Sequence, residues 1–259
     1  MALTDAQLSA WVANLIWPFL RVFGLLLAAP LFSLQGVTQR LRTLVALVLV
    51  IVIWPRLPPP PAFDIISVQG FITGVFEFII GMVLGFVIQL LFAIVVFMGQ
   101  AMANSMGLGF AAMVDPQNGQ QVPMLSQFYV IITTLLFLSM DAHLVLIELV
   151  LESFTTLPVG DFFRAADFRR LADFGSRIFA GGLLLAMPAV ASLLLVNISF
   201  GVVSQAAPQL NIFAVGFPVT LLLGILLSGL ILPGLVEQFE GVAAQAFALL
   251  ESLIRFQGE

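Results

Sequence analysis

The chain has 259 residues, of which 61% are hydrophobic and only 9% charged; its net charge is −5 and it has no cysteine. Because soluble domains carry about 25% charged residues, this composition excludes a water-soluble globular domain and predicts a polytopic membrane protein. The absence of cysteine excludes disulfides and thiolate metal sites. Without a basic patch, the sequence gives no reason to expect nucleic acid as a partner.

Apolar runs of roughly the length that membrane helices need follow one another along the chain. The sequence contains six such runs: 11–32, 41–54, 65–103, 125–151, 178–203 and 212–236. As one straight helix, the third would reach roughly 58 Å, about twice the bilayer core, so it must tilt, bend or leave the membrane.

Two further segments complete the predicted elements. The apolar N-terminal segment is expected to remain in the mature protein. The proline-rich segment 55–61 is expected to be an extended linker, and 235–256 an amphipathic helix. The first basic residue, Arg21, lies inside the first apolar run, which does not fit a signal peptide.

The distribution of charge argues against a plain bundle of six spans. Two arginines lie in the first connection and four in the fourth, which six simple spans would place on opposite sides of the membrane. Segments 78–114 and 178–236 each include a connection, yet contain no Asp, Glu, Lys, Arg or His. Such neutral connections suit packing inside protein or lining a neutral cavity.

Arg21 and Glu77 are the charged residues placed within apolar runs. Charges at such positions are rare and usually face the protein interior or a partner. We expect a structural ion pair that supports assembly, made with each other or with another subunit; a direct transport role is the alternative. Gly81 and Gly85 have the spacing that lets membrane helices pack closely.

Catalytic and metal-binding constellations are not found in the sequence. Asp141 and His143 end the core of the fourth run, but a metal site would need more ligands. No phosphate-binding glycine loop, nucleophile elbow or zinc-type spacing occurs, so we expect neither an enzyme nor a cofactor.

Residues 107–123 form the most unusual connection, rich in glycine, methionine, glutamine and asparagine. Glycines supply backbone freedom, methionines supply adaptable packing, and Asp115-Pro116 favours a turn. Such a loop can fill a neutral pore and still move aside, although an ordinary connection has the same composition.

Three segments together resemble the flagellar biosynthesis family FliR. The first is Arg21 with 24–30, the second is 106–128, and the third is 206–218, in the order of the family. The resemblance covers essentially the whole chain. One departure is Asp141-Ala142-His143, where the family often has Asp-Gly-His-His.

The resemblance implies an all-α, polytopic membrane-associated protein with kinked helical hairpins. Residues 1–176 would be a FliP-like part, 177–238 a FliQ-like hairpin and 239–259 a C-terminal amphipathic helix. The protein would be one subunit of a pseudo-sixfold gate with FliP and FliQ, in contact with FlhB and lipid, at the flagellar basal body of the bacterial inner membrane. That gate passes unfolded flagellar subunits. A subunit of a virulence injectisome is the nearest alternative, and a small-solute transporter is the alternative from another class.

The resemblance also implies site residues. The segment 107–119 would be a pore plug, whose candidate residues are Met106, Gly107, Leu108, Gly109, Phe110, Met113, Asp115, Pro116 and Gly119. The FliQ-like turn would comprise Gln205, Pro208, Gln209, Asn211, Gly216 and Pro218.

Overall fold

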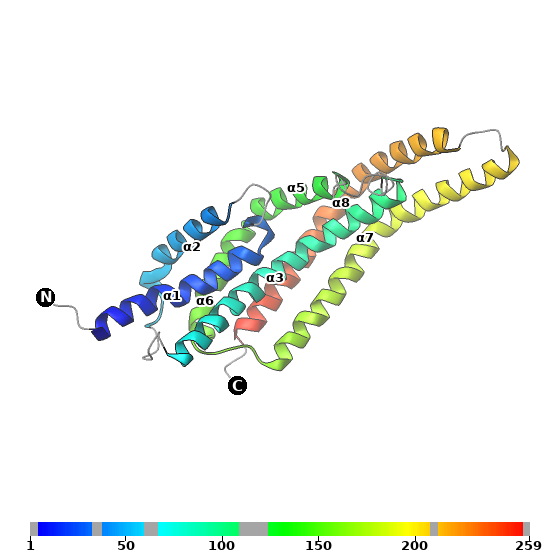
Figure 1. The fold of residues 1–259 in the computed structure, drawn as a ribbon. Helices are drawn as coiled ribbons and strands as arrows, with labels where there is room; N and C mark the ends of the chain where they lie inside the picture. The colour runs from blue at the N-terminus through cyan, green and yellow to red at the C-terminus, as the bar shows by residue number, and fades with distance from the viewer. Residues whose placement is uncertain (1–4, 33–37, 60–66, 109–123, 208–211, 256–259) are drawn as a thin grey trace. The chain divides into compact units, whose positions relative to one another are not determined.

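The structure is a computed structural model that describes residues 5–32, 38–59, 67–108, 124–207 and 212–255 (Figure 1). These residues are almost entirely helical, which confirms the predicted all-α class. The helices are α1 Asp5–Ala28, α2 Gln39–Ile53, α3 Val68–Ser105, α5 Met124–Ser139, α6 Ala142–Thr156, α7 Ala165–Ala206 and α8 Ile212–Arg255, with 3₁₀ turns η1 Pro30–Phe32 and η2 Trp54–Arg56.

The chain forms two compact units, each built from segments that are separate in the sequence. The first unit consists of Met1–Leu90, Leu138–Asp173 and Ala244–Glu259, and the second of Leu91–Phe137 and Phe174–Ala243. Helices α3, α7 and α8 therefore each contribute to both units. The predicted FliQ-like hairpin, 177–238, lies within one segment of the second unit, whereas the predicted FliP-like part is shared between the two.

Three described helices are long and apolar enough to cross a membrane: Val68–Ser105, Ala165–Ala206 and Val215–Arg255. The pair α5 and α6 would add a fourth span if it crosses as one unit, and the apolar part of α1 is shorter. Helix α3 is continuous over 38 residues, about 57 Å at 1.5 Å per residue. The six apolar runs thus do not become six straight spans in the part of the chain described.

The predicted fourth run, 125–151, is not one helix. It is divided into α5 and α6, which meet at an angle of 64°. Asp141 lies at the break in the left-handed conformation, with φ of 53°. Aspartate is one of the few non-glycine residues that adopt this conformation readily, and its carbonyl accepts the first backbone bonds of α6, from Leu144 and Val145. Hydropathy does not detect such a break because the flanking residues remain apolar.

The ends of the other helices also differ from the prediction. Residues 54–56 form η2, and Leu57 after it is extended, so the predicted proline-rich linker 55–61 begins with a turn; residues 60 and 61 lie outside the described residues. Helix α7 starts at Ala165, so it includes residues 165–177 of the expected connection between the runs 125–151 and 178–203. Helix α8 continues through the predicted C-terminal helix without a break. Its prolines, Pro218 and Pro233, lie inside the helix.

Helices α1 and α3 approach closely in the first unit because glycines face the contact. A Cβ atom on Gly85 would lie 2.6 Å from the carbonyl oxygen of Leu25 and 2.8 Å from Cβ of Ala28. A Cβ atom on Gly81 would overlap the carbonyl group of Arg21. Backbone atoms cannot move aside as side chains do, so these positions accept only glycine at the present helix separation.

We predict that Gly81→Ala lowers the free energy of unfolding of the chain within its purified complex by about 1–3 kcal/mol, because the added methyl group forces α1 away from α3. Gly74→Ala on the same helix is the control, since its Cβ would meet only side chains of Leu20 and Trp17, at 3.2 and 3.4 Å. Thermal unfolding in detergent measures the difference. Equal melting temperatures for the two variants would contradict the predicted backbone contact.

Candidate functional site

A buried ion pair joins α1 to α3 inside the first unit. The side chains of Arg21 and Glu77 are both 0% exposed. Nε of Arg21 donates to Oε2 of Glu77 at 2.7 Å, and Nη2 donates to Oε1 at 3.0 Å. This two-point geometry is the strongest that a guanidinium and a carboxylate can form. Of the two partners left open for Arg21 by the sequence, the structure shows Glu77.

The remaining N–H groups of Arg21 bind the end of α6. Nη1 donates to the carbonyl oxygen and to Oγ of Ser153, at 2.8 and 2.9 Å, and Nη2 donates to the carbonyl oxygen of Leu157 at 3.0 Å. All five donors of the guanidinium are thereby used. The last carbonyls of a helix lack partners within it and carry partial negative charge, so a cation at this end stabilises α6.

Two further contacts enclose the pair. The ring of Phe154 lies 4.2 Å from Cζ of Arg21, within cation–π distance. The backbone N–H of Gly160, in the loop after α6, donates to the carboxylate of Glu77. Gly160 has φ of 105°, a conformation that other residues rarely adopt. The arginine network thus consists of Arg21, Glu77, Ser153, Phe154, Leu157 and Gly160.

Sequence reasoning found only the two charged members of this network. Three of the other contacts use backbone carbonyl or N–H groups, which every residue carries, so no residue type marks them in the sequence. The hydroxyl of Ser153 could have been found only as a polar group on the otherwise buried face of α6.

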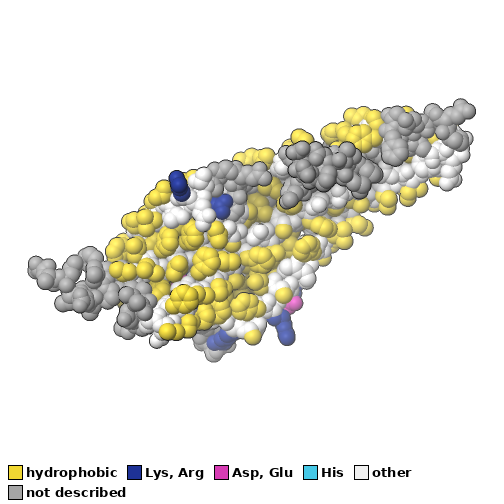
Figure 2. All heavy atoms as spheres, in the orientation of Figure 1, with side chains coloured by type: hydrophobic (Ala, Val, Ile, Leu, Met, Phe, Trp, Pro, Cys, Tyr) yellow, Lys and Arg dark blue, Asp and Glu magenta, His cyan; other side chains and the backbone are white. Residues whose placement is uncertain are grey.

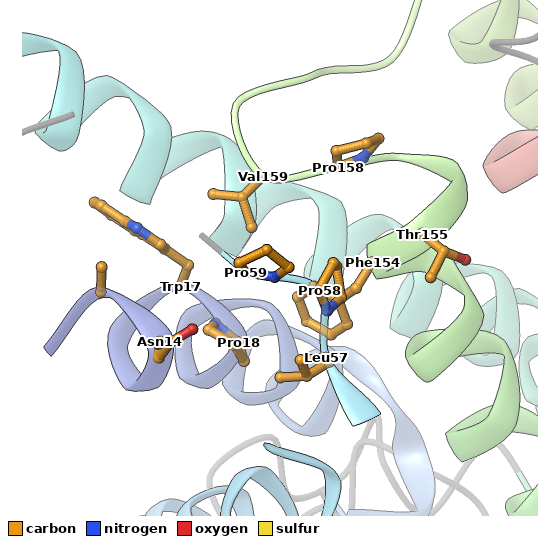
Figure 3. Close-up of a pocket in the computed structure, with 11 residues that line it drawn as sticks. Asn14, Trp17, Pro18, Leu57, Pro58, Pro59, Phe154, Thr155, Pro158 and Val159 are labelled. Carbon is orange, nitrogen blue, oxygen red and sulfur yellow. The ribbon is translucent and has the colours of Figure 1, made fainter. Parts of the chain in front are cut away.

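A pocket of about 340 Å³ adjoins the network through Phe154 (Figure 3). Its walls come from α1, from the segment after η2, and from the end of α6 with the loop beyond it. The lining residues are Ala13, Asn14, Trp17, Pro18, Leu57, Pro58, Pro59, Phe154, Thr155, Pro158 and Val159. None of these side chains is ionisable, so the pocket offers apolar walls rather than acid–base groups.

The candidate plug begins at the end of α3. Met106 and Leu108 are described, and between them Gly107 has φ of 82°. The other plug candidates lie outside the described residues: Gly109, Phe110, Met113, Asp115, Pro116 and Gly119. Their role remains a prediction.

The FliQ-like turn is only partly described. Gln205 lies in the last turn of α7 and is exposed, whereas Gly216 is buried and Pro218 exposed in α8. Pro208, Gln209 and Asn211 lie outside the described residues. Among the residues that are described, no group of three or more His, Asp or Glu side chains could hold a metal ion.

We predict that Arg21→Ala lowers the yield of assembled complex and destabilises the fold by about 3–5 kcal/mol, because it leaves the Glu77 carboxylate buried without its partner. Arg21→Lys should not restore stability, since an ammonium lacks the planar five-donor geometry. Thermal unfolding and complex yield are the measurements.

The exposed pair of Arg255 and Glu152, joined at 2.8 Å, supplies the control. Arg255→Ala should change stability little, because solvent screens this pair. The double variant Arg21→Met with Glu77→Leu should recover part of the loss, since it removes both charges. Normal yield and stability of Arg21→Ala would contradict a structural role for the network.

The chain is similar to known proteins over nearly its whole length. Residues 12–246 match the family described as bacterial export proteins, family 1. The chain is 36% identical to the flagellar biosynthetic protein FliR of Pectobacterium carotovorum, over 94% of each chain. It is 35% identical to FliR of Escherichia coli K12, over 98% of this chain and 97% of the other.

A relative with a different name is more distant in sequence. The surface presentation of antigens protein SpaR of Shigella flexneri is 29% identical over 58% of each chain. The match to bacterial export proteins reaches into both compact units, covers most of α1 and most of α8, and includes Arg21, Glu77 and the end of α3. The chain therefore belongs to the FliR family of bacterial export proteins.

Proposed function

We infer that this membrane-embedded chain is a subunit of the flagellar type III protein-export apparatus. The observation that carries this conclusion is the match to FliR proteins along nearly the full length of both chains. We further propose that it lies in the bacterial inner membrane at the flagellar basal body, and that FliP, FliQ and FlhB are its partners. Unfolded flagellar subunits would be the transported substrates, and the chain itself would catalyse no reaction.

The second unit supports a role in assembly. Its α7 and α8 segments expose large apolar side chains, among them Leu184, Leu195, Leu222 and Leu230, each at least 67% exposed. Figure 2 shows hydrophobic side chains over much of the described surface on one face, with few charged groups. Apolar helices without charge need cover from lipid or from protein. Copies of FliP and FliQ would supply that cover if the chain completes their ring.

The arginine network argues against the small-solute transporter. A transporter would need an ionisable group that its substrate or coupling ion can reach near mid-membrane. Arg21 and Glu77 are instead buried and bonded to each other, with all five donors of Arg21 engaged. This arrangement favours a structural ion pair over a transport role.

Flagellar and injectisome roles share one mechanism, and the higher identity favours the flagellar one. Matches to FliR reach 36%, whereas the match to SpaR is 29% over a shorter part of the chain. Neighbouring genes distinguish the two roles: a flagellar operon supports the proposal, and an injectisome operon would replace it.

We expect the chain to co-purify with FliP and FliQ as a complex of defined mass and to be unstable when produced alone. The physical reason is the exposed apolar surface of α7 and α8, which partners would bury. Mass measurement of the purified complex gives the copy number. A stable homo-oligomer formed without FliP and FliQ would contradict the proposal.

We also propose that 107–119 forms part of the plug that closes the pore. Deleting this segment should let the assembled gate conduct small ions while export of flagellar subunits persists at least in part. Ion conductance is compared with the wild-type complex at equal yield. Unchanged conductance in a fully assembled complex would remove the plug role without affecting the assignment to the export apparatus.

A further inference from the structure

The last turn of α3 is bonded entirely within the second unit, and its partners come from three places. An α-helix leaves its last four carbonyl groups without partners of its own. For α3 these are the carbonyls of 103–105 and of Met106, the residue that caps the helix, and they immediately precede the segment 107–119.

The turn itself satisfies the first two carbonyls. The N–H of Gly107 donates to the carbonyl of Asn104 at 3.1 Å, and that of Leu108 donates to Ala103 at 3.0 Å. With Gly107 at φ of 82°, this is the Schellman pattern that often ends a helix at glycine.

Side chains distant in sequence satisfy the other two. Nδ2 of Asn197, on α7, donates to the carbonyl of Ser105 at 3.1 Å. Oγ1 of Thr220, on α8, lies 3.4 Å from the carbonyl oxygen of Met106 and 3.0 Å from that of Phe217, so its single proton is shared between them. Both arms of the α7–α8 hairpin therefore bind the end of α3.

The side chain of Met106 is held as well. It is 2% exposed and packs on Gly224, one turn beyond Thr220 on α8. A Cβ atom at position 224 would lie 2.5 Å from Sδ and 2.6 Å from Cε of Met106, so any larger residue there would require the Met106 side chain to leave this position.

A residue of α5 joins α3 and α8 one turn away from Met106 and Gly224. The hydroxyl of Tyr129, on α5, donates to the carbonyl of Ser228 at 3.2 Å and lies 3.8 Å from Sδ of Met102. Met102 and Met106 are four residues apart on α3, as Gly224 and Ser228 are on α8. The end of α3 is thus joined to α8 directly at Met106, and through Tyr129 of α5 at Met102.

We propose that Thr220 and Gly224, with Asn197, are positioning residues that hold the end of α3 and set the point from which 107–119 leaves the helix. We call these three residues the α3 clamp. Because both arms of the hairpin contribute to it, a displacement of the hairpin is transmitted directly to Met106 and Gly107. The link from this displacement to pore closure rests on the proposed function.

Hydrogen exchange on the purified whole complex tests the clamp. In Gly224→Ala the added methyl group displaces the Met106 side chain, and the backbone amides of 106–108 should exchange about fivefold faster, an effect of the size that the loss of one ordinary hydrogen bond produces. Gly229→Ala is the matched control on the same helix, because nothing lies within 4 Å of its added Cβ. Equal exchange in the two variants would overturn the clamp.

A second pair keeps the test decisive if Gly224→Ala does not assemble. Thr220→Val removes the hydroxyl at nearly constant volume and should speed hydrogen exchange of the amides of 106–108. Thr220→Ser retains the hydroxyl and should leave their exchange rates unchanged. Equal exchange in these two variants would also contradict the clamp, because a purely steric role for Thr220 would not distinguish them.

Ion conductance of the same complexes separates the clamp from the plug. Faster exchange at 106–108 together with an ion leak supports both the α3 clamp and the plug role of 107–119. Faster exchange with a tight gate retains the clamp and contradicts the plug role of 107–119. A leak without faster exchange at 106–108 overturns the clamp and leaves the plug in place.

Discussion

A guanidinium enclosed by protein has to place all five of its N–H groups, and Arg21 does so by drawing three parts of the chain together. Glu77 of α3 supplies two acceptors, and the end of α6 supplies the rest. An unpaired charge at such a depth would cost several kcal/mol, so the alternatives in which these segments separate are strongly disfavoured. The positions of α1, α3 and α6 in the first unit follow from this one requirement.

The close packing of α1 on α3 and the ion pair depend on each other. Gly81 lies one turn after Glu77 on α3, and its missing side chain makes room for the carbonyl group of Arg21. Without that space, α1 could not approach near enough for the 2.7 Å contact between Nε and Oε2. The pair in turn holds together two helices whose apolar surfaces alone would gain little from contact in lipid. The ion pair of Arg21 and Glu77 and the glycine at position 81 therefore stabilise the same contact between α1 and α3.

The second unit solves the same problem without charge. Between 178 and 236 the chain has no ionisable Asp, Glu, Lys, Arg or His side chain. The polar contacts that join helices of the second unit include those of Ser126, Tyr129, Asn197 and Thr220. Neutral hydrogen bonds are weaker than the arginine network and separate at lower cost. A unit held in this way can rearrange at lower cost than the first unit, where opening the arginine network would leave a charge buried without its partner.

The sequence by itself determined the class of protein, the helical character of the chain, the two charges within apolar runs and the spacing of Gly81 and Gly85 that allows close helix packing. Each of these features can be predicted from residue type and spacing, because hydropathy, charge and the absence of a side chain act locally. The family could also be recognised from three short segments. Only the tertiary structure decided which partner Arg21 takes, that α5 and α6 part at Asp141, that α8 runs on to Arg255, and that Gly224 receives Met106. These features depend on backbone groups and on contacts between distant segments, and a backbone carbonyl is the same in every residue until the fold gives it a neighbour.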